Sequence, residues 1–149
     1  MSAATWRIHC DGAALPNLGA LAVGVVIVAP DGTRHEVSRL VGRGGCCNEG
    51  EALALIVALQ AARSLGARSI DVSCDSTIII DHAFDGATTT VARLARLYAE
   101  ARALLAEFDE VAVRWVPRRL NAEADALARA ALGLGARVAV ARKKKRRRR

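Results

Sequence analysis

Residues 6–12 read WRIHCDG, and this stretch alternates apolar and polar residues before it delivers Asp11 directly ahead of a glycine. Since successive side chains of a β-strand point to opposite faces, the pattern predicts a strand with Asp11 at its carboxyl end. Residues 69–76 (SIDVSCDS) repeat this alternating pattern and place Asp75 after a second cysteine. Two such strands in matching phase predict a parallel pair whose aspartates meet at the carboxyl edge of the sheet, where open α/β sheets place their sites.

The other patterns predict an α/β domain built on a mixed five-stranded sheet. A Val/Ile-rich run before the turn Pro30-Asp31-Gly32 and an alternating run after it continue the first strand as an antiparallel meander. Helical crossovers then make the last two strands parallel, and the sheet is flanked by helices. The expected elements are strands 6–12, 20–29 and 33–41, helix 48–64, strand 69–75, helices 77–84 and 89–107, strand 110–116, and a helix capped by Asn121 that runs to about residue 132.

Length and charge divide the chain into a folded domain at residues 1–135 and a basic tail at residues 136–149. The 149 residues suit a single domain with a real core. The net charge is +7, but residues 142–149 (RKKKRRRR) carry eight positive charges, so residues 1–141 sum to −1. We expect the tail to be disordered and to attract nucleic acid through its phosphates. The alternative is a targeting-like or solubilising terminus without a specific role.

The sequence indicates neither a membrane protein nor a disulfide-bonded protein. No apolar run reaches the roughly 18 residues that a membrane span needs, and the first residues lack the apolar core of a signal peptide. We therefore expect no membrane partner and a cytoplasmic location. Of the four cysteines, Cys10 and Cys74 lie in apolar strand phase, whereas Cys46 and Cys47 are adjacent. This spacing favours free or buried thiols over disulfides or a zinc site.

Four acidic residues are candidates for one site, and each also has a simpler interpretation. Asp11 and Asp75 could each cap the turn that follows, but their matched phase favours a shared site. Glu51 fits the N3 position of a capping box that begins at Asn48, although it also faces the sheet side of its helix. Asp125 lies beside the apolar stripe of the last helix, where an isolated carboxylate would be costly without a partner.

A bound cation is the partner that such converging carboxylates need. Carboxylates on one spot repel one another, so ionising them together requires a compensating positive charge. Hard oxygen ligands of this kind suit Mg²⁺ or Mn²⁺. Two such ions about 3.5 to 4 Å apart can activate a water and stabilise the leaving oxygen in phosphodiester hydrolysis. The acids therefore indicate hydrolysis that needs neither histidine nor cysteine.

The ordered motifs resemble the type 1 ribonuclease H family, and most of all its compact, reverse-transcriptase-associated branch. Within about residues 5–132 they are Asp11-Gly12, Asn48-Glu49-Gly50-Glu51, Asp75-Ser76, Trp115-Val116-Pro117-Arg118 and Asn121-Ala122-Glu123-Ala124-Asp125. The resemblance implies the ribonuclease H-like fold, a two-metal active site and hydrolysis of the RNA strand of RNA/DNA hybrids. It also implies that the catalytic, metal-binding residues are Asp11, Glu51, Asp75 and Asp125.

The resemblance further implies which residues contact the hybrid. They are Gly12, Asn48, Ser76, Thr77, Arg118 and Arg119. The chain departs from the family where Cys47 replaces the first of two asparagines and Thr77 replaces a glutamine. It also lacks the basic handle of longer members and the histidine that many bacterial members carry before the last helix. Arg118 or Arg119 either replaces this histidine as a charge that helps product leave, or is a solvated loop residue.

The sequence thus predicts a metal-dependent endonuclease of RNA/DNA hybrids with Mg²⁺ or Mn²⁺ as its cofactor. One alternative is a non-catalytic nucleic-acid-binding module of the same fold, against which the four intact acids argue. The other is a resolvase-like metal nuclease that acts on DNA, and no sequence feature excludes it.

Overall fold

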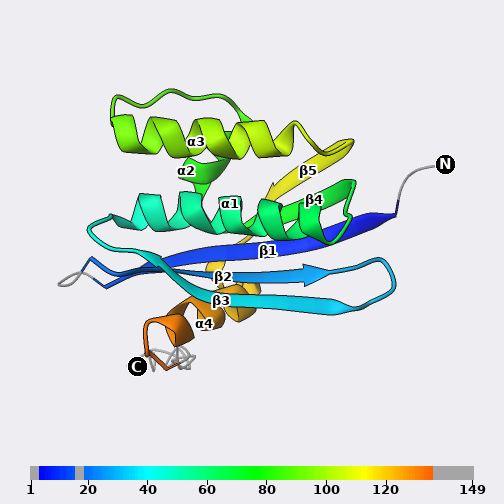
Figure 1. The fold of residues 1–149 in the computed structure, drawn as a ribbon, viewed down its shortest axis with the longest axis horizontal. Coiled ribbons are helices and arrows are strands. Elements are labelled where there is room, and N and C mark those ends of the chain that lie inside the picture. Colours follow the sequence, from blue (N-terminus) through cyan, green and yellow to red (C-terminus); the bar gives the residue numbers. More distant parts are fainter. Residues whose placement is uncertain (1–3, 16–18, 136–149) are drawn as a thin grey trace, which may run out of the picture.

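The computed structural model describes residues 4–15 and 19–135, which form a sheet between two layers of helices. Helices α1 and α3 lie on one face of the sheet and α4 lies on the other (Figure 1). In chain order the elements are β1 (Thr5–Ala14), β2 (Leu21–Val28), β3 (Arg34–Gly42), α1 (Cys47–Ser64), β4 (Ser69–Cys74), α2 (Thr77–Ile79), a π-helical turn (Ile80–Phe84), α3 (Ala92–Leu105), β5 (Glu110–Trp115), a 3-10 turn (Arg118–Leu120) and α4 (Ala122–Ala131).

The five strands are ordered β3-β2-β1-β4-β5 across the sheet. Strand β1 pairs antiparallel with β2, and β2 pairs antiparallel with β3. The pairs β1 with β4 and β4 with β5 are parallel. The expected mixed sheet, with three antiparallel strands followed by two parallel strands, is therefore confirmed.

Strand β1 is longer than expected, and this changes where Asp11 lies. The parallel pairing of β1 with β4 ends at His9 and Ser73. The antiparallel pairing with β2 continues, so Asp11 lies opposite Gly24 and the strand reaches Ala14. Asp11 is thus inside a strand, and the prediction that it ends one was wrong. It lies just past the last β4 pair, where that side of β1 is open.

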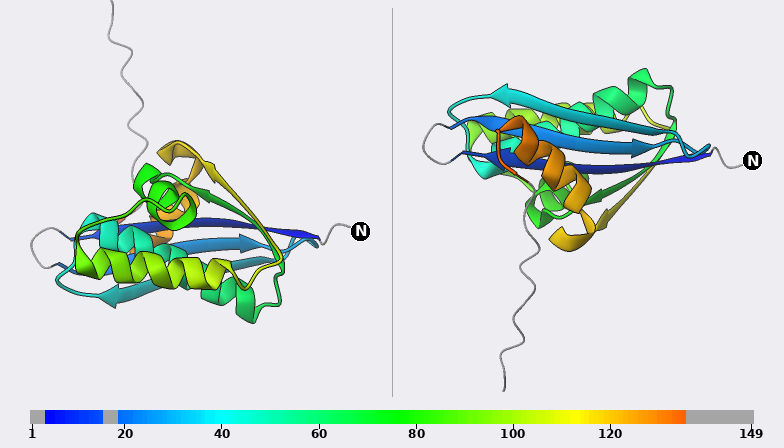
Figure 2. Two further views of the ribbon diagram at one scale, coloured as in Figure 1. Left: turned by 90° about the horizontal axis from the view of Figure 1, so that it is seen from above. Right: turned by 90° about the horizontal axis from the view of Figure 1, so that it is seen from below.

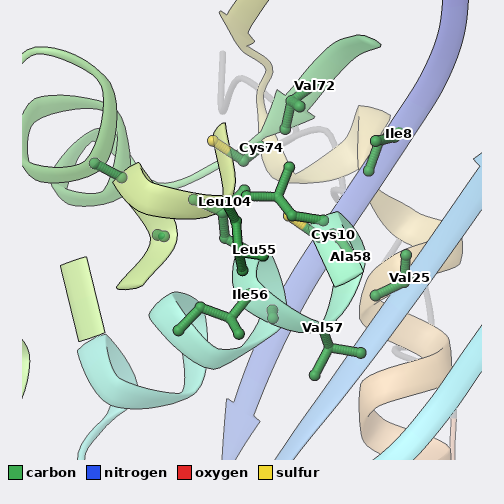
Figure 3. Close-up of a cluster of buried hydrophobic side chains, with 14 of the residues drawn as sticks. Ile8, Cys10, Val25, Leu55, Ile56, Val57, Ala58, Val72, Cys74 and Leu104 are labelled. Carbon is green, nitrogen blue, oxygen red and sulfur yellow. The ribbon is translucent and has the colours of Figure 1, made fainter. Parts of the chain in front are cut away.

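The core lies between the sheet and α1. Ile8 and Cys10 of β1 are buried together with Leu55 of α1 and Val72 of β4. Figure 3 shows these side chains converging on one cluster, to which α3 adds Leu104. The expected alternation along β1 is therefore confirmed, since alternate residues enter this core. The cysteine prediction is confirmed as well, because all four cysteines are free and Cys10 and Cys74 are buried.

Two helices lack the side-chain caps that the sequence predicted. Helix α1 begins at Cys47 with Cys46 at its N-cap, and no side chain caps it, so the capping box from Asn48 to Glu51 was wrong. Helix α4 has Asn121 at its N-cap, but the Asn121 side chain makes no capping hydrogen bond. Both polar side chains that would have capped a helix, Glu51 and Asn121, are instead directed at the site described below.

Helix α4 packs directly on β2 because Gly24 has no side chain. A Cβ atom at this position would lie 2.0 Å from the carbonyl oxygen of Ala124 and 2.6 Å from the nitrogen of Ala128. The contact holds the helix that carries Asp125 against the sheet.

The Gly24→Ala variant is expected to lose about 1 to 3 kcal/mol of unfolding free energy, because the new methyl group meets backbone atoms that only a shift of α4 can clear. Urea denaturation measures the change. Gly42→Ala is the matched control, since a Cβ there meets nothing within 4 Å. Equal stability of the Gly24 and Gly42 variants would show that α4 does not depend on this close approach.

The described part of the chain contains no helix that is long and apolar enough to cross a membrane.

Candidate active site

Three carboxylates from three separate elements converge beside the open edge of β1. Asp11 lies in β1, Glu51 in the first turns of α1, and Asp75 directly after β4. One carboxylate oxygen from each residue lies within 4.8 Å of the other two. The expected meeting of Asp11 and Asp75 at this edge of the sheet is thus confirmed, and Glu51 joins them.

Close packing of two glycines brings α1 to β1. A Cβ atom at Gly12 would lie 2.2 Å from the backbone carbon of Gly50, so the first turn of α1 rests directly on the strand. The backbone of Gly12 also makes a hydrogen bond with the Glu51 carboxylate. Gly12 therefore has a packing role and orients Glu51, whereas its expected contact with a hybrid stays a prediction.

The site is electrostatically unfavourable without a cation. Burial, followed by the charges of Glu51 and Asp75, raises the pKa of Asp11 to about 10. Burial also raises the pKa of Glu51 to about 7, with Asp75 acting in the same direction. A hydrogen bond with Asp11 and the charge of Arg118 act in the opposite direction. At neutral pH the cluster therefore retains a proton when no cation is bound, because three clustered carboxylates repel one another.

Asp125 lies next to this cluster. It is buried in the first turns of α4, with 5% of its surface exposed. Its hydrogen bond with Asp11 contributes to the raised pKa of that residue. The structure therefore places all four predicted acids in one region, with three of them within a common ligand distance. Their catalytic roles stay predictions.

Asn121 belongs to the site, although its sequence position indicated only a helix cap. Its side chain is buried, and its amide nitrogen donates to the Cys10 carbonyl oxygen at 2.9 Å and to Asp75 Oδ2 at 3.4 Å. Its amide oxygen lies 3.3 Å from His9 Nδ1. Since the amide oxygen only accepts, Nδ1 of His9 carries the hydrogen of this bond. Asn121 thus ties Asp75 to β1.

No signal in the sequence distinguished this use of Asn121 from capping. The residue precedes the last helix, where asparagine commonly accepts from backbone N–H groups. The contacts of its side chain depend on β1 and on the residue after β4, which are distant along the chain.

The predicted substrate-contacting residues around the carboxylates differ in their exposure and in their hydrogen bonds. Asn48 is half-buried in the first turn of α1, and Thr77 is exposed. The Ser76 hydroxyl accepts a hydrogen bond from the Ile79 backbone nitrogen at 3.3 Å, so it caps α2.

Arg118 and Arg119 are both exposed in the 3-10 turn before α4, but they differ in their surroundings. Arg118 lies close enough to Glu51 to lower the pKa of that carboxyl. Arg119 instead lines a cavity with Arg7 and Arg34. The geometry therefore distinguishes two arginines that the sequence left equivalent.

Comparison with known proteins identifies the family that the chain resembles. The family model described as reverse transcriptase-like matches residues 9–131. The chain is 39% identical over 129 residues to the ribonuclease HI of Halobacterium salinarum, a match that covers 85% of this chain and 64% of that protein. This chain thus spans slightly less than two thirds of that relative.

Solved structures agree with this match. The crystal structure of ribonuclease H1 from Halobacterium salinarum superposes with a TM-score of 0.81 at 37% identity, covering 87% of this chain and 98% of that one. The N-terminal ribonuclease H domain of a Mycobacterium tuberculosis protein gives a TM-score of 0.78 at 32% identity, covering 85% and 98%. A ribonuclease H1 isolated from compost, solved in complex with an RNA/DNA hybrid, gives 0.76 at 27% identity, covering 86% and 96%.

Proposed function

We propose that this chain, which belongs to the type 1 ribonuclease H family, is a metal-dependent endonuclease that hydrolyses the RNA strand of RNA/DNA hybrids. The observation that carries this proposal is the convergence of Asp11, Glu51 and Asp75, with carboxylate oxygens within 4.8 Å of one another. The hybrid bound to a related ribonuclease H1 supports the substrate class.

The donor set fits a divalent cation of the hard type. It consists of carboxylate oxygens, which Mg²⁺ and Mn²⁺ prefer, and the raised pKa values of Asp11 and Glu51 indicate a local lack of positive charge. Asp11, Glu51 and Asp75 would hold the metal, and Asp125 would complete the set. Two bound cations would supply activation of the attacking water and stabilisation of the leaving oxygen. We propose Mg²⁺ or Mn²⁺ as the ion.

The residues around the carboxylates keep them in position. Asn121 donates a hydrogen bond to Oδ2 of Asp75 at 3.4 Å, which holds that carboxylate beside β1. The indole nitrogen of Trp115 donates to the Asp75 carbonyl oxygen at 3.2 Å, which fixes the backbone at the same residue. The neighbouring Cys74 does not supply a thiolate nucleophile, because burial raises its pKa to about 11 and keeps the thiol protonated. Substrate contacts are assigned to Asn48 and Thr77 on the rim.

Cleavage assays test this function. Purified protein with Mg²⁺ or Mn²⁺ is expected to cut the RNA strand of a labelled hybrid and to leave duplex RNA, duplex DNA and single strands intact. Cleavage of duplex or branched DNA alone would show a resolvase-like nuclease. Hybrid binding without cleavage in either metal would show a non-catalytic module.

Arg118 is proposed to help the cleaved product leave, since it is the arginine whose charge reaches Glu51. Arg118→Ala is expected to lower kcat about tenfold if release limits turnover, with Arg118→Lys recovering much of the loss. Arg119→Ala is the comparison variant and is expected to change kcat far less. Steady-state and single-turnover rates separate release from chemistry. A larger kcat loss in the Arg119 variant would contradict the assignment.

The basic tail lies outside the described residues, and both its disorder and its role stay predictions. If residues 142–149 only gather nucleic acid, their deletion is expected to raise KM with kcat nearly unchanged, because uniform binding is removed. The slope of log affinity against log salt should become shallower, by up to about 0.9 for each phosphate that the tail no longer neutralises. A kcat loss at unchanged KM would instead place the tail in the active assembly. The domain limits and the cytoplasmic location also stay predictions.

A further inference from the structure

The face of the sheet opposite α1 is only partly covered. Helix α4 packs on β2, with lesser contact to β1 and β3 (Figure 2, right). Beside it lie two cavities of about 360 and 400 Å³, and both are lined by Arg7, His9 and Leu120. We call their combined surface the open-face groove.

Strand pairing defines the floor of this groove. His9 lies opposite Val26 on one side and Ser73 on the other, and Ser73 lies opposite Arg114. The next row holds Arg7 between Val28 and Asp71. Because directly paired residues share a face, each row runs across the sheet from β2 toward β5. The floor therefore combines valines near β2 with polar and charged side chains toward β5.

Four arginines from different parts of the chain surround the groove. They are Arg7, Arg34, Arg114 and Arg119. Arg34 pairs with Glu123, and Arg114 pairs with Asp71 at 2.7 Å. Among the described residues, Arg7 and Arg119 make no ion pair within 4 Å. Cations thus outnumber acids around the groove, and two of the cations are available to an anion.

The groove leads to the proposed active site. Asp11, His9 and Arg7 follow one another on the same face of β1, in steps of about 6.6 Å. The 3-10 turn connects the carboxylates to the groove, because the charge of Arg118 lowers the pKa of Glu51 and the adjacent Arg119 lines the groove. The buried side chain of Asn121 covers β1 at His9 and Cys10, so a strand that leaves the carboxylates would enter the groove over the exposed 3-10 turn, past Arg118 and Arg119.

We propose that the open-face groove binds the single-stranded phosphodiester backbone that extends beyond the paired part of a substrate. This inference rests on the proposed function. The arginines suit phosphates, while the exposed Leu120 and the half-buried Val28 and His9 provide apolar surface against which unpaired bases can pack. The chain's own tail is a poor occupant, because its eight cations at residues 142–149 repel the same arginines.

The test compares a blunt RNA/DNA hybrid with the same hybrid carrying a single-stranded extension at either end. The variant is Arg7→Ala/Arg114→Ala, which changes neither a carboxylate nor a predicted hybrid contact. Its matched control is Arg39→Ala/Arg68→Ala. Like Arg7, Arg39 makes no ion pair among the described residues, and like Arg114, Arg68 is paired with an aspartate, Asp109. Affinity is measured over a series of salt concentrations in full-length protein.

Wild type is expected to bind the extended hybrid about fivefold more tightly than the blunt one, and the groove variant should lose this gain. Its salt slope on the extended hybrid should fall by about 0.7, for the one single-strand phosphate that the unpaired Arg7 neutralises. Cleavage of the blunt hybrid should be unchanged in both variants.

Equal affinity of wild type for blunt and extended hybrids would overturn the inference, as would an equal loss in the control variant. Self-association that the groove variant abolishes, or tighter binding of an acidic peptide than of a single strand, would assign the groove to another occupant and overturn it too. Failure of the proposed function gives a different result from failure of this inference. In that case wild type does not cleave the blunt hybrid, but binding of a single-stranded oligonucleotide to the groove can still be measured.

Discussion

The Asp75→Asn variant is expected to lose at least about 10³-fold in kcat/KM on an RNA/DNA hybrid while it folds normally. The amide removes one charge from the carboxylates that would hold the metal, and it keeps an oxygen that can accept the hydrogen bond from Asn121. Initial cleavage rates at saturating Mg²⁺ measure the loss. Asp85→Asn, at an exposed position on the surface, is the control and should retain full activity.

The same variant should also report on metal binding. Without metal, Asp75→Asn is expected to be as stable as wild type or more stable, because the charge of Asp75 opposes ionisation of Asp11 and Glu51. Mg²⁺ should raise the melting temperature of wild type through binding linkage, and that of the variant much less. Undiminished turnover, or an equal Mg²⁺ response in both proteins, would contradict the assignment of Asp75.

Metal-free protein is expected to lose stability as the pH rises through the acid range, because the folded state binds the protons of Asp11 and Glu51 more tightly than the unfolded chain does. The pKa of Glu51 rises from 4.5 in the unfolded chain to about 7 in the fold. The unfolding free energy therefore falls between these two pKa values, by up to about 3 kcal/mol from Glu51. Asp11, with a pKa of about 10, extends the fall to higher pH.

Glu51→Gln isolates this contribution, because glutamine does not ionise. In chelator the variant should match wild type near about pH 4 and exceed it in stability near about pH 8. Saturating Mg²⁺ should remove most of the difference, since a cation stabilises the ionised carboxylates. Glu100→Gln, on the exposed side of α3, controls for loss of a surface charge. Parallel pH profiles of the Glu51 variant and wild type would show that the fold does not raise the pKa of Glu51.

Much of the fold was predictable because it rests on short-range periodicity. The alternation at residues 6–12 and 69–75 indicated which side chains enter the core, and β1 and β4 bury Ile8, Cys10 and Val72 as expected. Helical spacing located α1 and α3, and the turn at Pro30 located the hairpin of β2 and β3. Matching phase in two strands was enough to bring Asp11 and Asp75 together.

Only the tertiary structure decided how the polar residues at element ends are used. Asp11 lies within a strand because β2 pairs past the point where β4 stops. Glu51 meets Asp11 rather than its own helix cap because two glycines let α1 rest on β1. Asn121 contacts Cys10 and Asp75 because Gly24 lets α4 pack directly on the sheet. Sequence periodicity reports which face of an element is buried, whereas the partner of a polar side chain at its end is set by packing between segments far apart in the chain.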